Sequence, residues 1–204
     1  MNPSVEAVVF DVGRVLVQWD LRFLFAKLID DPDRLEWFVT NVVTPEWHFQ
    51  HDAGRPLDEM IPERIAEFPD CADLIEAYRC RFGETIPGAI PGSIELVEAL
   101  AARGVPLFAI TNFGAEFWPP FRAEWPMLDL FRDIVVSGVE RIAKPNPAIY
   151  ALAARRFGHA PEAMLFIDDN AENIAVARDC GWQVHHFVDA ERLKADLSAH
   201  GLLG

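Results

Sequence analysis

The sequence is poor in cysteine and in basic residues and has no long uninterrupted apolar segment. Its three cysteines, Cys71, Cys80 and Cys180, form no C-x-x-C pair, so we expect neither a disulfide framework nor a thiolate zinc site. No window approaches the roughly 18 consecutive apolar residues of a membrane span, and Met1 to Phe10 lack the pattern of a signal peptide. These absences favour a cytoplasmic protein in a reducing environment.

The shortage of basic residues limits the expected partners. Lys and Arg number 18 against 32 Asp and Glu, which gives a net charge of −14. Because such a surface repels a phosphate backbone and an anionic bilayer, we expect no nucleic acid and no membrane partner. The hydrophobic share of 51% over 204 residues is that of a globular chain. This length fits one domain, or one domain with an insertion, and either a monomer or a homodimer.

Short apolar segments and amphipathic segments alternate over most of the chain. The apolar segments typical of buried strands are Val5–Phe10, Val105–Ile110, Asp133–Gly138, Ala163–Ile167 and Trp182–Phe187. Helical patterns from residue 92 onward cover Gly92–Arg103, Pro147–Phe157, Ala171–Cys180 and about Ala190–His200. This alternation predicts an α/β fold with a Rossmann-like parallel sheet and right-handed crossovers.

The connection between the first two predicted strands is too long for a single crossover helix. Residues 11 to 111 separate the ends of these strands, whereas a βαβ unit takes about 30 residues. Residues 21–82 have the pattern of several helices, and a Pro/Gly-rich segment, 86–92, follows them. We therefore predict a helical cap subdomain over residues 19–87, inserted into a core domain formed by residues 1–18 and 88–204.

Polar residues gather at the ends of the predicted strands. They are Asp11 after the first strand, Thr111 and Asn112 after the second, Lys144 before the helix that follows the third, and Asp168 and Asp169 after the fourth. Parallel strands present their carboxyl ends to a shared crevice, so we expect these side chains to lie close together. Clustered carboxylates stay ionised together only around a cation, and oxygen ligands favour Mg²⁺ over zinc.

Each of these residues also has a purely structural explanation. Asp11 could be a turn residue, Lys144 a surface lysine, and the acidic pair a cap for the helix that begins at Ala171. The order and spacing of all four segments together favour a functional site, in which one Asp could serve as a covalent nucleophile.

Four segments resemble the motifs of haloacid dehalogenase-like (HAD) hydrolases. They are Phe10–Leu16, Ile110–Asn112, Lys144-Pro145 and Phe166–Asn170. The insertion resembles the helical C1-type cap of that superfamily, and the resemblance extends from Val5 to about Ala199. Within the superfamily, Trp47–Gly54 and Phe117–Pro119 are most similar to bacterial α-D-glucose-1-phosphate phosphatases.

The resemblance implies a metal-assisted phosphatase site. Asp11 would attack phosphorus and form an aspartyl-phosphate. Mg²⁺ would be held by the Asp11 carboxylate and the Gly13 carbonyl, with Asp169 as a direct ligand and Asp168 acting through water. Thr111 and the backbone of Asn112 would hold phosphoryl oxygens, and Lys144 would neutralise charge, so that the work is mostly electrostatic.

Position 13 departs from the commonest phosphatase pattern. Most such enzymes have an Asp two residues after the nucleophile as general acid and base, which is worth about 10²–10⁴-fold in rate, but Gly13 cannot carry a proton. His48, His51 and Asp52 of the predicted cap are candidates for the missing proton carrier or for substrate contacts, although a packing role fits them too. Arg14 could meet a substrate anion or be a surface arginine.

We therefore expect a Mg²⁺-dependent phosphomonoesterase acting on a small phosphorylated metabolite, with a sugar phosphate as the expected class. One alternative is a metal-independent 2-haloacid dehalogenase with the same Asp nucleophile, although such enzymes lack an acidic pair like Asp168-Asp169. The other is a non-catalytic protein that binds a phosphorylated ligand.

Overall fold

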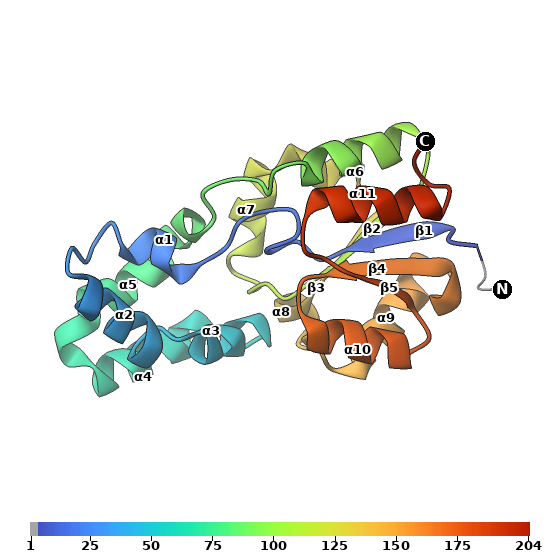
Figure 1. The fold of residues 1–204 in the computed structure, drawn as a ribbon. Helices are drawn as coiled ribbons and strands as arrows, with labels where there is room; N and C mark the ends of the chain where they lie inside the picture. Colours follow the sequence, from blue (N-terminus) through green and yellow to red (C-terminus); the bar gives the residue numbers. More distant parts are fainter. Residues whose placement is uncertain (1–3) are drawn as a thin grey trace.

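A five-stranded parallel sheet forms the centre of the computed structural model, which describes residues 4–204 (Figure 1). Its strands are β1 (Ala7–Phe10), β2 (Leu107–Thr111), β3 (Asp133–Val136), β4 (Met164–Asp168) and β5 (Gln183–His186). They lie in the order β3-β2-β1-β4-β5. The five predicted strands and the predicted α/β class are confirmed, with small shifts at the strand ends.

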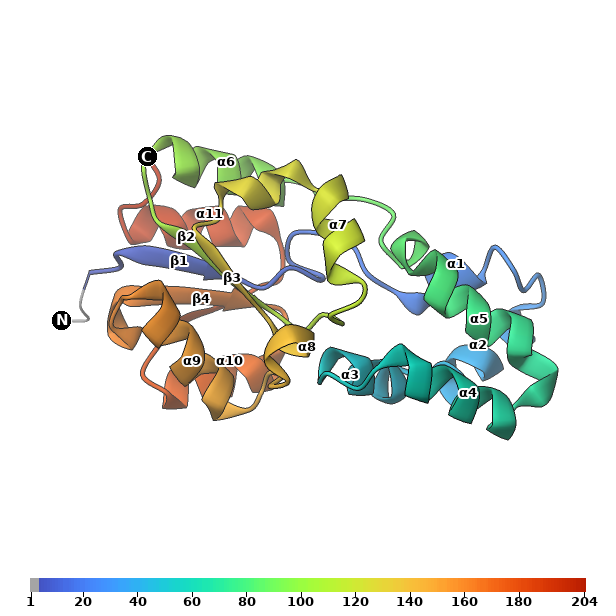
Figure 2. The same ribbon diagram turned by 180° about the vertical axis from the view of Figure 1, so that it is seen from behind.

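Helices cover both faces of the sheet (Figures 1 and 2). On one face lie α6 (Ser93–Ala102) and α11 (Ala190–Ala199), and on the other lie α9 (Pro147–Phe157) and α10 (Ala171–Asp179). Alternate strand residues point to opposite faces, so Val8 and Phe10 join one apolar core whereas Ala7 and Val9 join the other. All four helices match the helical patterns expected from the sequence.

The segments on either side of β3 contain helices that the sequence pattern did not predict. Before β3 lie α7 (Trp118–Glu124) and the 3₁₀ segment η3 (Pro126–Leu130), and directly after β3 lies the short α8 (Ser137–Glu140). Pro119 and Pro120 lie in the first turn of α7, where a missing N–H costs no helical hydrogen bond. A further 3₁₀ turn, η4 (Pro161–Ala163), precedes β4.

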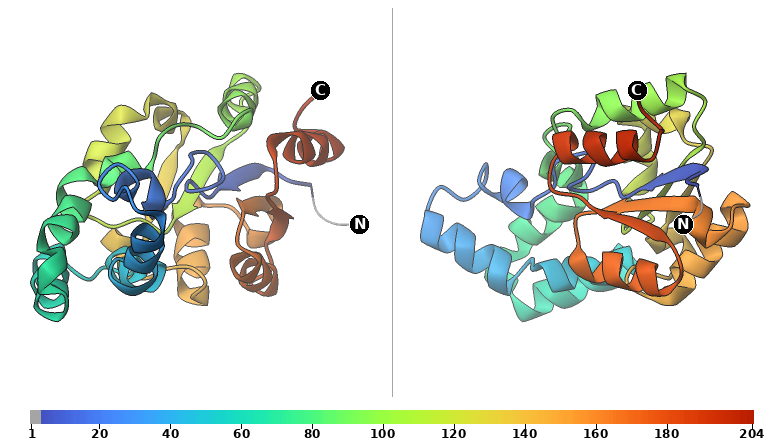
Figure 3. Two further views of the ribbon diagram at one scale, coloured as in Figure 1. Left: turned by 60° about the vertical axis from the view of Figure 1, so that its left-hand side comes forward. Right: turned by 45° about the vertical axis from the view of Figure 1, so that its right-hand side comes forward.

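The long connection after β1 folds into a group of helices beyond the carboxyl ends of the strands. They are α1 (Leu21–Phe25), α2 (Pro32–Asn41), α3 (Pro45–Asp52), α4 (Leu57–Glu67), η1 (Pro69–Cys71), α5 (Ala72–Arg81) and η2 (Phe82–Thr85). Both views of Figure 3 show this blue-to-teal group beside the sheet. We call it the cap, and we keep residues 19–87 as its proposed boundaries.

In the cap, α2 and α3 each begin with a side-chain N-cap. Asp31 accepts hydrogen bonds from the backbone at the start of α2, and Thr44 does so at the start of α3; each is followed by a proline at the first helical position.

None of the described helices has the length and apolar character that crossing a bilayer requires.

The register of the central strands sets the position of the polar residues. Phe10 pairs with Ile167, and the Asp11 N–H donates to the Ile167 carbonyl at 2.8 Å. The next residues along each strand, Asp11 and Asp168, therefore leave the sheet side by side. The order β3-β2-β1-β4-β5 reverses its direction between β1 and β4, which is where open α/β sheets bind their ligands.

Candidate active site

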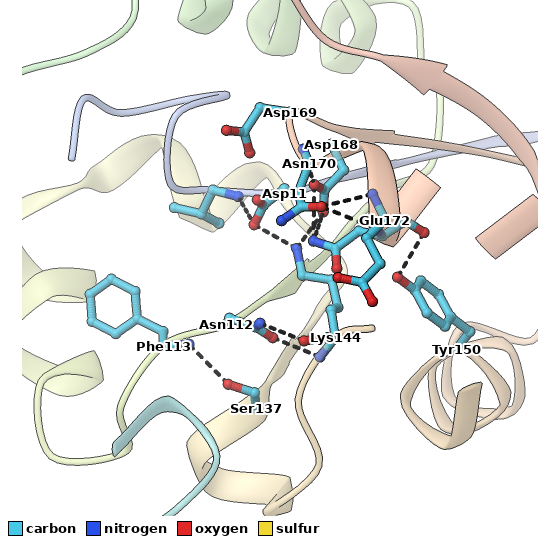
Figure 4. A network of polar contacts seen from close by, with 12 residues as sticks. Asp11, Asn112, Phe113, Ser137, Lys144, Tyr150, Asp168, Asp169, Asn170 and Glu172 are labelled. Carbon is cyan, nitrogen blue, oxygen red and sulfur yellow. Dashed lines mark hydrogen bonds and ion pairs between the residues drawn. The ribbon is translucent and has the colours of Figure 1, made fainter. Parts of the chain in front are cut away.

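Three carboxylates meet at this reversal point (Figure 4). Asp11 follows β1, Asp168 ends β4, and Asp169 comes directly after it. One oxygen from each side chain lies within 4.8 Å of the others. Asp11 and Asp168 are buried and Asp169 is partly buried, so their mutual repulsion is only weakly screened by water.

A buried lysine lies against two of these carboxylates. Lys144 Nζ lies 2.9 Å from Asp11 Oδ1 and 2.7 Å from Asp168 Oδ2, and the lysine is 1% exposed. Asn112 fixes the lysine backbone: its Nδ2 donates to the Lys144 carbonyl at 2.9 Å, and its Oδ1 accepts from the Lys144 N–H at 2.8 Å. Asn112, which follows β2, thereby holds the backbone of Lys144, which lies in the segment after β3 (Figure 4).

The charges of this cluster do not balance without a further cation. Burial raises the pKa of Asp11 to about 7, against the opposing effect of Lys144 and with the help of Asp168 and Asp169. Burial and the charge of Asp168 also raise the pKa of Asp169. Although burial lowers the pKa of Lys144, Asp11 and Asp168 outweigh it, so the net shift is upward and the lysine is charged. One ammonium therefore faces three carboxylates, an arrangement that favours a bound metal cation.

Asp168 is fully engaged in hydrogen bonds. Asn173 Nδ2 donates to both of its oxygens, at 3.1 and 3.0 Å, and the Asn170 N–H donates to Oδ1 at 2.8 Å. Tyr150 donates its hydroxyl hydrogen to the Asn173 carbonyl at 3.0 Å. Asp169 takes no part in these contacts, so its carboxylate is the more available of the pair. The positioning role of Asn173, five residues after Asp168 in the first turn of α10, was not foreseen from the sequence.

The cluster opens into a cavity of about 270 Å³ between the core and the cap. Its core side is lined by Asp11, Gly13, Arg14, Asn112, Lys144 and Asp169, among others. Its cap side is lined chiefly by apolar and aromatic residues, Trp19, Pro45, Phe49, Phe82 and Ile86, with His48 and Asp52 among them. An apolar wall with a few polar groups is typical of small-molecule sites.

Gly13 and Arg14 lie in the cavity wall. A Cβ added to Gly13 would have no heavy atom within 4 Å, so the absence of a side chain there is not imposed by packing. Arg14 has a φ of 60°, and its guanidinium lies 5.0 Å from the centre of the Trp19 ring. Arg14 also helps to lower the pKa of Asp169 against the effect of burial, which places its charge near the carboxylate cluster.

Two predicted site residues are not part of this cavity wall. Thr111 is the last residue of β2 and is 1% exposed; its hydroxyl has no hydrogen-bond partner among residues 4–204. His51 was expected to share a substrate-facing surface with His48, but its ring packs on Phe117 and its Nδ1 lies 2.9 Å from the Arg55 carbonyl. His51 thus packs at the contact between cap and core, and the substrate-binding role predicted for it stays a prediction.

Residues 5–181 match the haloacid dehalogenase-like hydrolase family. This match covers most of the chain, and the protein belongs to that family. The fold and the residues that follow its strands thus confirm the family resemblance that the sequence motifs indicated.

Curated relatives of the chain carry several names. Sesquiterpene phosphatase astK of Aspergillus oryzae is 25% identical over 193 residues, 93% of this chain and 93% of that protein. Phosphoglycolate phosphatase of Escherichia coli is 28% identical over 126 residues, 62% of this chain and 50% of that enzyme. Acyl-CoA dehydrogenase family member 10 of Mus musculus is 25% identical over 199 residues, 87% of this chain but 17% of that protein. The chain thus spans only a small part of the mouse protein.

Solved structures of other family members share the fold. A HAD family enzyme from Bacteroides thetaiotaomicron aligns with a TM-score of 0.72 at 18% identity, covering 96% of this chain and 99% of that chain. L-2-haloacid dehalogenase from Xanthobacter autotrophicus aligns with a TM-score of 0.63 at 20% identity, covering 98% and 85%. At these identities the likeness concerns the fold alone, and it agrees with the predicted α/β architecture.

Proposed function

We propose that this protein is a Mg²⁺-dependent phosphomonoesterase that acts on a small phosphorylated metabolite through an aspartyl-phosphate on Asp11. The observation that carries the proposal is the placement of Lys144 between Asp11 and Asp168, with Asp169 beside them. An ammonium and a metal cation beside a buried carboxylate would offset the charge of both the nucleophile and a phosphoryl group. The phosphatase names of two curated relatives support the same reaction class.

The residues present fit a magnesium ion. Three carboxylate oxygens lie within 4.8 Å of one another, and hard oxygen ligands are those that Mg²⁺ prefers. Asp11, the Gly13 carbonyl and the freer Asp169 would hold the ion, and Asp168, fixed by Asn173 and Lys144, would act through water. When bound, Mg²⁺ would neutralise charge on the phosphoryl oxygens and orient them.

The protein groups would act mainly by holding charge in place. Oδ1 of Asp11 accepts from the Val12 N–H at 2.7 Å and lies against Lys144, whereas Oδ2 is engaged in neither contact and can form the bond to phosphorus. Lys144 would balance the charge that the phosphoryl group brings. The backbone of Asn112, which lines the cavity, would donate to phosphoryl oxygens at the end of β2, and the same role for the Thr111 hydroxyl, outside the cavity wall, stays a prediction from the family resemblance.

Three classes of phosphorylated molecule are candidate substrates. A sugar phosphate, and glucose 1-phosphate in particular, stays a prediction from motif resemblance. The relatives are named for phosphoglycolate and for a sesquiterpene, and the cap side of the cavity is rich in aromatic rings. All three kinds of phosphate therefore belong in a substrate panel.

The test is phosphate release from that panel, with Mg²⁺ and with EDTA, by the wild-type protein and by Asp11→Asn. We expect release that requires both Mg²⁺ and Asp11. Halide release from 2-haloacids in EDTA would instead support the dehalogenase alternative. Binding of phosphorylated ligands without turnover would support the non-catalytic one, and either result would contradict the proposal.

A further inference from the structure

The proposed reaction needs a proton carrier, and the residue two positions after the nucleophile is Gly13. We propose that Asp52, at the end of α3, is the general acid and base, and that His48 and Tyr78 position it. This inference rests on the proposed phosphatase function and adds a catalytic residue from the cap to it.

Asp52 lies in the same cavity as the carboxylate cluster. Asp52 and His48 line the cap side of the cavity and Asp11 and Lys144 line its core side. The volume of about 270 Å³ lies just below the roughly 300–1,000 Å³ typical of pockets for drug-sized ligands. A single small phosphorylated molecule would therefore contact both walls, with its phosphoryl group at Asp11 and its leaving oxygen toward the cap.

Hydrogen bonds fix the orientation of the Asp52 carboxyl group. His48 Nδ1 lies 2.7 Å from the Tyr78 hydroxyl, and His48 Nε2 lies 3.1 Å from Asp52 Oδ2. Burial, together with Asp52 and Glu116, raises the pKa of Tyr78 well above its usual value, so the phenol keeps its proton and donates it to Nδ1. The Nε2–H of His48 then donates to Oδ2 of Asp52.

The other carboxyl oxygen of Asp52 is left without a partner. Asp52 is 6% exposed, and its Oδ1 has no hydrogen-bond partner among the described residues. A buried carboxyl oxygen without a partner is costly, and a substrate oxygen or water in the cavity would satisfy it. Oδ1 is thus the atom available for proton exchange.

The aromatic rings around His48 make this arrangement rigid. The imidazole stacks on Trp19, with ring centres 4.9 Å apart, and on Phe82, with ring centres 5.6 Å apart. The Nε2–H of His48, held in place by these rings, can therefore stabilise by hydrogen bonding the Asp52 carboxylate that forms when the proton is given away.

The core holds the end of α3 in place. Ser137 donates its hydroxyl hydrogen to the Asp52 carbonyl at 2.5 Å and accepts from the Phe113 N–H at 3.0 Å. Phe113 follows Asn112 at the end of β2, so the backbone of Asp52 is tied to a segment of the carboxylate site itself.

The other ionisable groups near Asp52 are Glu116 and His51, whose Nε2 has no hydrogen-bond partner among the described residues. Glu116 accepts from the Leu57 N–H at 3.0 Å. Burial lowers the pKa of His51, and its Nδ1 faces the Arg55 carbonyl. Neither lines the cavity, so the His48–Asp52 pair is the ionisable unit that the cap presents to a ligand.

The proton transfers balance over one catalytic cycle. As the Asp11–phosphorus bond forms and the bond to the leaving oxygen breaks, Oδ1 of protonated Asp52 gives its proton to that oxygen and releases an alcohol. The Asp52 carboxylate then takes a proton from the water that attacks the aspartyl-phosphate. Inorganic phosphate leaves, and Asp11 and Asp52 return to their initial states.

The test compares the first turnover of wild type and Asp52→Asn in Mg²⁺ on two substrates. One is p-nitrophenyl phosphate, whose leaving oxygen needs no proton, and the other is an alkyl phosphate that the wild type cleaves. We expect the variant to lose about 10²–10⁴-fold on the alkyl phosphate but less than about tenfold in its first p-nitrophenolate release. Phosphorylated enzyme should accumulate with the aryl substrate, because the attacking water has lost its base.

A matched control and a positioning variant complete the test. Glu76→Gln changes an exposed acid on α5 and should leave both rates unchanged. His48→Phe removes the donor to Asp52 but keeps an aromatic ring, and it should lower the alkyl rate more than the aryl rate. Aryl turnover in each variant also shows that the protein is folded.

Equal losses of Asp52→Asn on the two substrates, or no loss on the alkyl phosphate, would overturn the role of Asp52. A wild-type protein that releases no phosphate at all would overturn the phosphatase proposal and this inference with it. Phosphate release by the wild-type protein therefore distinguishes a failure of the phosphatase proposal from a failure of the role of Asp52.

Discussion

Lys144 Nζ lies 2.9 Å from Asp11 Oδ1, and both side chains are buried at the carboxyl end of the sheet. The lysine also lies 2.7 Å from Asp168 Oδ2, so one ammonium is the counter-charge of both the carboxylate after β1 and the carboxylate at the end of β4. A buried ion pair is costly to break from one side, because the remaining charge has no partner. Replacing Lys144 therefore tests two effects separately, the rate of the reaction through kcat and the stability of the fold through Tm.

Lys144→Met should abolish most of the activity and change the stability of the metal-free protein. Loss of one preorganised charge at a phosphoryl site costs about 2.7–4 kcal/mol in the barrier, or roughly 10²–10³-fold in kcat. The measurement is kcat with p-nitrophenyl phosphate, together with Tm in EDTA and in Mg²⁺. We expect a lower Tm in EDTA and a larger rise on adding Mg²⁺ than in wild type. Lys194→Met, which changes an exposed lysine on α11, is the control, and equal kcat values in the two variants would contradict the role of Lys144.

Gly13→Asp should be tolerated and should replace part of the function of Asp52. An added Cβ at this position meets no heavy atom within 4 Å, and the new carboxyl group would lie in the wall of the same cavity. Added to Asp52→Asn, Gly13→Asp should raise the rate on an alkyl phosphate at least about tenfold above that of Asp52→Asn alone, because the new carboxyl group would act as a general acid. A folded double variant without any restoration would show that proton transfer does not limit that rate.

The raised pKa of Asp11 predicts how the stability of the metal-free protein depends on pH. Between the ordinary value of 3.8 and about 7, the folded state keeps a proton that the unfolded chain has lost. The free energy of unfolding therefore falls as the pH rises through this range. Asp11→Asn lacks this titration, so in EDTA its Tm should exceed that of wild type at about pH 8 and match it near pH 4.

Magnesium should reverse this order at the higher pH, because it binds the ionised Asp11 and stabilises the wild type. Thermal unfolding followed by fluorescence, with and without Mg²⁺, measures all four conditions. A wild-type Tm in EDTA that rises from pH 4 to pH 8 relative to Asp11→Asn would contradict the sign of the shift.

Gly114→Ala should disturb the contact between cap and core. A Cβ at Gly114 would lie 2.0 Å from His51 Cδ2 and 2.2 Å from His51 Nε2, so the His51 ring or α3 must move. We expect a lower Tm and a lower kcat, because α3 carries both His48 and Asp52. Gly83→Ala, whose Cβ meets nothing within 4 Å, should leave both unchanged. If adding His51→Ala to Gly114→Ala restores Tm and kcat, the clash with His51 is the cause. Unchanged activity in Gly114→Ala would contradict the expected disturbance of α3.

The strands and the residues that follow them were the features best predicted from the sequence. Short apolar segments and the alternation with helices predicted all five strands, and the parallel arrangement then required Asp11, Asn112, Lys144 and Asp168 to meet. That inference holds because the register of a parallel sheet places the residue after each strand at one edge. The pattern was less informative from Gly114 to Leu130, where prolines inside α7 concealed a helix.

The cap side of the site depends on packing between segments far apart in the chain. Helical spacing placed His48 and His51, three residues apart, on one face of α3, whereas the contact of His48 with Asp52 came from the structure. No local pattern indicated that Tyr78, 30 residues later, would set the tautomer of His48, or that Trp19 would stack on it. The same limit applies to His51, whose contact with Phe117 follows from how α3 meets the core rather than from its spacing.

The most direct test of the central claim is to trap the covalent intermediate on Asp11. The protein is mixed with p-nitrophenyl phosphate and Mg²⁺, quenched in acid within the first turnover, and digested for peptide mass spectrometry. We expect one added phosphoryl group on the peptide that contains Asp11, at its highest level in Asp52→Asn and missing in Asp11→Asn. Phosphate release without modification of Asp11, or with the phosphoryl group on another residue, would contradict it.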